Sequence, residues 1–159
     1  MPFGVEIVTL SPTSTARAAQ LDSLIASADA VWFIAPETAG CLEGLALRAE
    51  RHETFLLGSD SETIRQASDK GAFPRRLVRQ GVTYPTTRVM RWGTDWQKWK
   101  EASSKIGYPV VVKPRRGAGC GGVCLARDVW ELRQGVDTAK EASERESLLL
   151  QRFVPGVPA

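Results

Sequence analysis

The chain has 159 residues, 43% of them hydrophobic and 25% charged, a balance typical of one compact globular domain or two small lobes. No apolar run approaches the ~20 residues needed to cross a bilayer, which excludes a membrane-spanning helix and gives no reason to expect a membrane partner. The net charge is only +3 and the basic residues are spread along the chain, so we also expect no nucleic-acid partner.

The first 67 residues predict a small parallel α/β lobe. Strands are expected at 4–10, 30–36 and 54–58, the middle one buried on both faces, with helices at 13–28 and 37–52. Alternation of strand and helix is the pattern of a parallel sheet with crossover helices. The N-terminal stretch MPFGVEIVTL lacks the basic flank and long apolar core of a secretory signal, so we expect a cytoplasmic protein.

From residue 59 onward, helices and strands alternate less regularly. Ser59 or Asp60 is expected to cap the first helix, and Thr94 is expected to cap the third. The second is expected to end at Gly81 and to start either at Asp69 or near Pro74, because proline disfavours a helix interior. The predicted helices cover 59–68, 69–81, 94–107 and 128–142. The predicted extended segments and strands cover 82–92, 109–114, 122–127 and 147–154.

The stretch YPVVVKPRRGAGCGGVCLA contains a G-x-G-x-x-G pattern at Gly117, Gly119 and Gly122. A dinucleotide fingerprint requires a helix directly after the glycines, and a P-loop requires a following Lys-Ser or Lys-Thr; neither is present. The strand–loop–strand order instead predicts a glycine-rich hairpin whose backbone N–H groups bind phosphates, with Lys113 at the end of its first strand. A tight hairpin with a surface lysine remains the structural alternative.

Four segments in order, SDKGAF, LVRQGVTYPTT, GYPVVVKPRRGAGCGGV and LLLQRFVPGVPA, resemble the ATP-grasp superfamily of carboxylate–amine and carboxylate–thiol ligases. Upstream, IAPET (34–38) and LGSD (57–60) are similar to the subgroup that includes tyramine–glutamate ligase of methanofuran synthesis. The resemblance implies an α/β fold: a partial Rossmann-like pre-ATP-grasp lobe (1–67) without its first strand and helix, then an α+β nucleotide-binding lobe (68–159) without its catalytic half.

This resemblance also implies the chemistry. In such ligases a carboxylate attacks the γ-phosphate of ATP, and an amine displaces phosphate from the acyl phosphate. The implied partners are ATP, Mg²⁺ and small carboxylate and amine substrates, with the metal ligands and catalytic residues expected beyond Ala159. We therefore expect a fragment, a partial gene product or a split protein that is inactive alone and prone to self-association.

Site residues follow from the resemblance by position in the motifs. Two lysines are expected to neutralise the α- and β-phosphates, and an arginine with four glycines is expected to form a lid over them. A glutamine stands where most members have glutamate and is expected to bind the adenine amino group. The residues are Lys70 and Lys113 for the phosphates; Arg116, Gly117, Gly119, Gly121 and Gly122 for the lid; and Gln151, Phe153 and Val154 for the adenine edge.

Two residues keep open alternatives. Val111 is expected either to pack on the adenine face or to belong to an ordinary core strand. Glu37 follows a predicted strand, where ligands often bind, and is expected either to grip the amine substrate or to act as a helix N-terminal carboxylate. For the whole chain, the rival to the ligase is a non-catalytic nucleotide- or partner-binding module derived from an ATP-grasp lobe.

Overall fold

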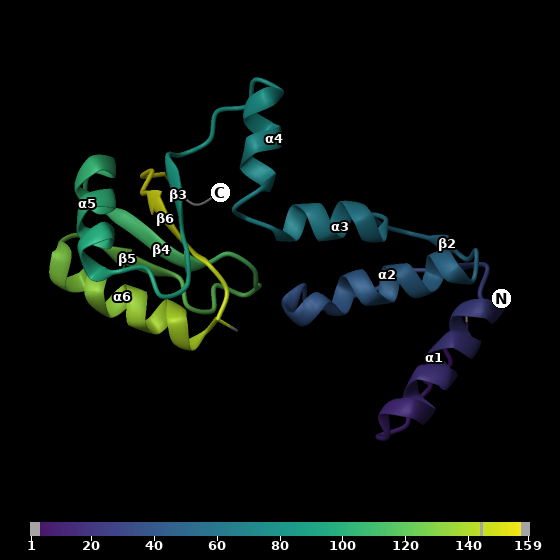
Figure 1. Ribbon diagram of the computed structural model, residues 1–159. Coiled ribbons are helices and arrows are strands. Elements are labelled where there is room, and N and C mark those ends of the chain that lie inside the picture. The colour runs from purple at the N-terminus through teal and green to yellow at the C-terminus, as the bar shows by residue number, and fades with distance from the viewer. Residues whose placement is uncertain (1–3, 144, 157–159) are drawn as a thin grey trace. The chain divides into compact units, whose positions relative to one another are not determined.

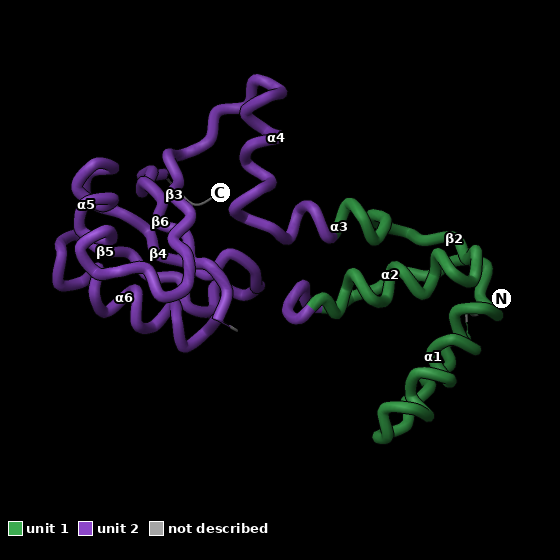
Figure 2. The backbone as a smooth tube through the Cα atoms, viewed as in Figure 1, with its two compact units in different colours: residues 1–35, 40–64 green, residues 36–39, 65–159 purple. Residues whose placement is uncertain are grey.

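The computed structural model describes residues 4–143 and 145–156, which divide into two compact units (Figures 1 and 2). Unit 1 comprises residues 1–35 and 40–64, and unit 2 comprises 36–39 and 65–159. The lobe boundary expected at 67/68 stays a prediction. Within the described ranges, no helix combines the length and apolar character needed to span a bilayer.

Unit 1 contains two helices and a two-stranded parallel sheet. The helices are α1 (Ser14–Ser27) and α2 (Cys41–Arg51), and the strands are β1 (Ala30–Val31) and β2 (Phe55–Leu56). Ala30 pairs with Phe55 in parallel register, which confirms the parallel pairing expected from the alternation of strand and helix. Thr54 Oγ1 donates to the Ile25 carbonyl at 2.9 Å and so links β2 to the end of α1.

Four predictions for this region were wrong. The segment 4–10 is not a strand, and β1 ends at Val31, because neither stretch has a longer partner to accept its backbone hydrogen bonds. The middle strand is also not buried, since the Ile34 side chain is 87% exposed. The helix predicted from Glu37 begins only at Cys41, after a short 3₁₀ turn, η1 (Thr38–Gly40), whose left-handed backbone at Ala39 and Gly40 interrupts it.

Unit 2 is built on a four-stranded antiparallel sheet in the order β3-β6-β4-β5. The strands are β3 (Thr87–Met90), β4 (Val110–Pro114), β5 (Cys124–Ala126) and β6 (Leu148–Arg152). The helices are α3 (Ser61–Ser68), which contains the boundary with unit 1, α4 (Phe73–Arg79), α5 (Trp96–Ile106) and α6 (Val129–Glu141). The predicted hairpin between β4 and β5 is confirmed by the pairing of Val112 with Cys124.

One face of this sheet is covered by α5 and α6, which lie together on the same side of the strands (Figure 1). The core between them consists of apolar side chains that alternate along the strands, as a period of two requires. Its buried members are Met90, Trp99, Ile106, Val110, Val112, Ala126, Leu132, Val136, Ala139, Leu148 and Leu150.

The helix ends follow capping chemistry, with one correction. Asp60 Oδ1 accepts from the Thr63 N–H at 2.6 Å, and Pro74 occupies the first turn of α4, as expected. The cap of α5 is Asp95 and not Thr94, because the Asp95 carboxylate accepts from the Gln97 N–H at 2.7 Å. The Thr94 hydroxyl instead donates to the Arg91 carbonyl.

Candidate functional site

The face of the sheet opposite the core carries the candidate site. Along β4, Val110, Val112 and Pro114 are buried, while Val111 and Lys113 are half-buried and belong to the alternate set. Since the first set includes the core valines, Val111 and Lys113 lie on the face away from α5 and α6. Val111 does not belong to the buried core cluster, and its packing on the adenine face stays a prediction.

Lys113 is held in place by a chain of side-chain hydrogen bonds across three strands. Its Nζ donates to Gln151 Oε1 at 2.8 Å, and Gln151 Nε2 donates to Thr87 Oγ1 at 2.7 Å. Burial lowers the pKa of Lys113, and the nearby charge of Lys70 lowers this pKa further. The ammonium group therefore sits half-buried against a neutral amide, an environment that an anion would favour.

Lys70 reaches the same region from the segment before α4. Its backbone N–H donates to the Arg115 carbonyl at 3.1 Å, and its Nζ donates to the carbonyl of Gly117 in the glycine loop. Two cationic side chains from distant parts of unit 2 thus meet at the start of that loop, each in contact with neutral oxygen atoms. Such a pair of lysines is suited to a ligand with several negative oxygens.

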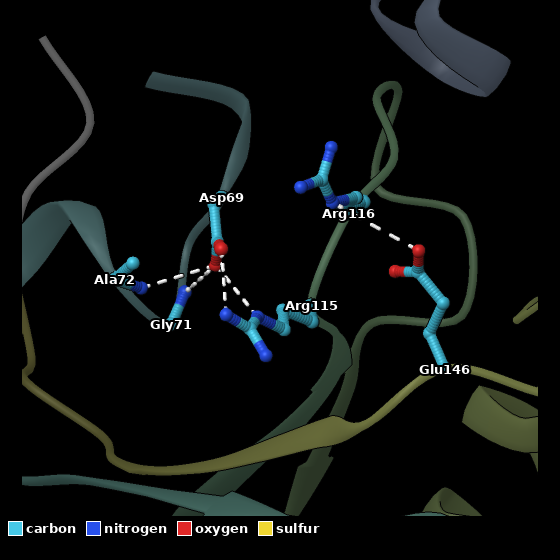
Figure 3. Close-up of polar contacts among 6 residues, drawn as sticks. All are labelled: Asp69, Gly71, Ala72, Arg115, Arg116 and Glu146. Atoms are coloured by element: carbon cyan, nitrogen blue, oxygen red, sulfur yellow. Dashed lines mark hydrogen bonds and ion pairs between the residues drawn. The ribbon is translucent and has the colours of Figure 1, made fainter. Parts of the chain in front are cut away.

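An ion pair that the sequence did not reveal fixes the Lys70 segment (Figure 3). Asp69 accepts from Arg115 Nε at 2.7 Å and Nη2 at 2.6 Å, and also from the backbone N–H groups of Gly71 and Ala72 at 3.0 Å each. These bonds, led by that of Arg115, lower the pKa of Asp69. Because the guanidinium binds both carboxylate oxygens, the pair sets the position and orientation of Lys70.

The loop 116–122 has two parts with different surroundings. Gly117 and Gly119 adopt positive φ angles of 118° and 65°, and a Cβ atom at either position would meet open space. Gly122 also has a positive φ, of 68°, but a Cβ there would lie 2.6 Å from Ala142 Cβ. The end of the loop is therefore anchored against α6, while the glycines before it are free to approach a ligand.

Backbone donors in the loop point to the same chemistry. The Gly121 N–H donates to the Ala118 carbonyl at 3.4 Å, whereas the N–H groups of Ala118, Gly119 and Cys120 have no acceptor among the described residues. Cys120 also has a positive φ of 59°. Consecutive amides in such left-handed turns form a concave surface that binds anions. Arg116, the predicted lid arginine, is exposed and lies 3.8 Å from the Glu146 carboxylate (Figure 3).

The predicted adenine-binding segment lies at the end of β6. The Phe153 N–H donates to the Pro109 carbonyl at 3.2 Å, so among the backbone groups of Phe153 only its carbonyl is left for a base. The Val154 side chain is 60% exposed. Gln151 uses both ends of its amide on Lys113 and Thr87, and in this arrangement its side chain positions the lysine. A direct adenine contact by Gln151 stays a prediction.

Two further expectations concern Glu37 and the metal ion. Glu37 is exposed in the segment 36–39, directly before η1, and its proposed role stays a prediction. No three histidine, cysteine, aspartate or glutamate side chains converge within 4–143 and 145–156, so no residue described here is assigned to a metal ion. Thr87, Asp69 and Arg115 are the positioning residues that sequence reasoning missed.

The amino-acid sequence is similar to families and proteins that are already known. Residues 69–157, more than half of the chain, match the family described as "Carbamoyl-phosphate synthase L chain, ATP binding domain", and residues 2–64 match the family described as "pre ATP-grasp 3 domain". The chain is 30% identical over 107 residues to the carbamoyl phosphate synthase large chain of Rubrobacter xylanophilus. That match covers 67% of this chain and 10% of the relative.

The fold is also similar to those of solved structures. A RimK domain ATP-grasp protein from Sphaerobacter thermophilus superposes with a TM-score of 0.67 at 26% identity, covering 80% of this chain and 47% of that one. The biotin carboxylase domain of 2-oxoglutarate carboxylase from Hydrogenobacter thermophilus, crystallised as a dimer with MgADP, ADP and bicarbonate, superposes with a TM-score of 0.68 at 25% identity. The latter match covers 93% of this chain and 34% of that one, so the chain spans only part of each of these relatives.

Proposed function

The chain belongs to the ATP-grasp superfamily, and from this membership we propose that it is the ATP-binding portion of an ATP-dependent carboxylate–amine ligase that acts through an acyl phosphate. The α/β fold expected for that superfamily is confirmed by the parallel and antiparallel sheets and by the structural similarities above. The observation that carries the function is the convergence of Lys70 and Lys113 at the glycine loop.

In this proposal the chain's own residues bind and orient the triphosphate. Lys113 and Lys70 neutralise phosphate oxygens, and the amides of Ala118, Gly119 and Cys120 donate to them as the loop closes. Arg116 exchanges its exposed partner Glu146 for a phosphate, at little cost because a surface ion pair contributes little. Val111 packs against the base, and the backbone beyond Gln151, at Phe153 and Val154, binds the adenine edge.

Gln151 orients Lys113 for this role. Its neutral amide oxygen accepts from the ammonium group at 2.8 Å and leaves the positive charge of Lys113 unbalanced. The pKa of Lys113 is lowered because burial and the charge of Lys70 make its ammonium form less stable than it is in water, and a bound anion would offset both effects. Phosphate binding would therefore restore an interaction that the empty site lacks.

The direct test is ATP affinity by calorimetry for the wild-type chain and Lys113→Ala. Loss of a charge-assisted contact of roughly 1.5–3 kcal/mol predicts an affinity at least about tenfold lower in the variant. Lys105→Ala, an exposed lysine in the last turn of α5, is the matched control and should bind ATP as the wild type does. Equal ATP affinity in Lys113→Ala and wild type would contradict the phosphate role of Lys113.

Substrate class and catalytic competence are separate proposals. IAPET and LGSD lead us to propose a relation to the subgroup that includes tyramine–glutamate ligase, with Glu37 gripping the amine substrate. Mg²⁺ is expected to be required, with its ligands supplied outside the described residues of this chain. ADP formation that needs both substrates would support a ligase, whereas ATP binding without turnover over a panel of acids and amines would favour the rival, a non-catalytic nucleotide-binding module.

A further inference from the structure

A cavity of about 360 Å³ in unit 2 is lined by three arginines from three different elements. Arg75 comes from α4, Arg91 follows the end of β3, and Arg115 follows the end of β4. Ser147, directly before β6, also lines this space. None of these four residues belongs to the set proposed above to contact the nucleotide.

The sheet register brings these residues into one row. Met90 pairs with Leu148, which places Arg91 beside Ser147, and the Arg115 N–H donates to the Ser147 carbonyl at 3.3 Å. Arg91 and Arg115 therefore flank Ser147 from neighbouring strands, about 10 Å apart across two strand spacings. Arg75 lies on α4, so arginines from both the sheet and the helix line the cavity.

The charges in this cavity are not balanced. Asp69 and Arg115 form a closed pair that leaves Arg115 Nη1 without an acceptor among the described residues. The side chains of Arg75 and Arg91 have no carboxylate or other hydrogen-bond acceptor within 4–143 and 145–156. Glu146, the carboxylate next to Ser147 in the sequence, pairs with Arg116. Three arginines thus line one space, and the only carboxylate bound to any of them among the described residues is Asp69.

From this geometry we propose that the cavity is a binding site for a phosphate-bearing small molecule, separate from the nucleotide site. Planar guanidinium groups that converge from several directions match the three terminal oxygens of a phosphate monoester, and the Ser147 hydroxyl can add a further donor. The volume equals that of about twelve liquid waters, so the cavity accommodates a small organic group attached to the phosphate.

The two anion sites are divided by the Asp69–Gly71 segment. Lys70 extends its side chain toward the glycine loop, whereas Gly71 and Ala72 line the arginine cavity. A ligand in the cavity would therefore contact the same segment that carries Lys70.

The test is calorimetric titration of the chain with inorganic phosphate and with glycerol 3-phosphate at constant ionic strength. Both should bind the wild type, and Arg91→Gln should bind each at least tenfold more weakly. Arg88→Gln is the matched control, because Arg88 lies on β3, the strand that Arg91 follows, but does not line this cavity. Lys113→Ala, which weakens ATP binding in the proposal above, should leave phosphate binding unchanged. Circular dichroism checks that each variant is folded.

Several results would overturn the inference. Phosphate affinity lost in Lys113→Ala but kept in Arg91→Gln would mean that phosphate enters the nucleotide site instead. Citrate bound as tightly as glycerol 3-phosphate would mean that the cavity selects negative charge and not a phosphate group. No binding of either phosphate ligand at 10 mM, roughly the weakest affinity that calorimetry resolves, would also refute it. Because ATP affinity is measured separately, the nucleotide proposal can fail while this one stands.

Discussion

Gly122→Ala tests whether the glycine loop is anchored at one end and free elsewhere. A Cβ atom at Gly122 would lie 2.6 Å from Ala142 Cβ and 3.1 Å from Pro114 Cγ, and φ at this residue is 68°. The left-handed backbone costs an alanine roughly 1–2 kcal/mol, partly offset by the reduced entropy of the unfolded chain. Forcing a methyl group into the contact with α6 adds roughly 1–3 kcal/mol. We therefore expect a total destabilisation of roughly 2–4 kcal/mol.

Gly119→Ala is the matched comparison, because φ is 65° at Gly119 but no atom lies within 4 Å of its Cβ position. It should cost only the backbone part, roughly 1 kcal/mol or less. Urea unfolding followed by tryptophan fluorescence measures both, since Trp99 in the core is only 2% exposed. If the two variants unfold at the same urea concentration, the anchoring of Gly122 is wrong.

Three further outcomes are expected. Amide hydrogen exchange in 116–122 should be fast in the free chain and slow with ATP and Mg²⁺; protection already complete without nucleotide would contradict the lid. Because the pKa of Asp69 is lower in the folded chain than its unfolded value near 3.8, the ionised carboxylate stabilises the fold at any pH above 3.8. This contribution is lost as the pH falls through the lowered pKa. Asp69→Asn should therefore be less stable than wild type at pH 7, with a gap in the free energy of unfolding that closes in acid; a gap independent of pH would refute this. ATP affinity should fall as pH rises through the lowered pKa of Lys113, below 10.5, and the same fall in Lys113→Ala would assign it to another group.

Local sequence patterns were sufficient for the hairpin that carries the candidate site. The apolar run of β4, the glycines after Lys113 and the apolar run that follows them predict strand, turn and strand from neighbouring residues alone. The helix starts at Asp60 and near Pro74 were predictable for the same reason, because capping depends on residues within one turn. The position of Lys113 at the end of its strand follows directly from these signals.

Long-range pairing decided what the sequence could not. The strands predicted at 4–10 and 30–36 have suitable residues, yet only Ala30 and Val31 found a partner strand, because a strand is stable only where another accepts its hydrogen bonds. Lys113 meets Gln151, Thr87 and Lys70 through contacts that span tens of residues.

What the sequence by itself determined is therefore the family, the hairpin and the two lysines, since these depend on short motifs and local periodicity. Tertiary structure alone decided that Asp69 clamps Arg115, and that Arg75 and Arg91 converge on one cavity. The residues next to a charged side chain in the sequence do not indicate which group it will contact in the folded protein. Which of them meet is set by sheet register and helix packing, and these are fixed only when the whole unit folds.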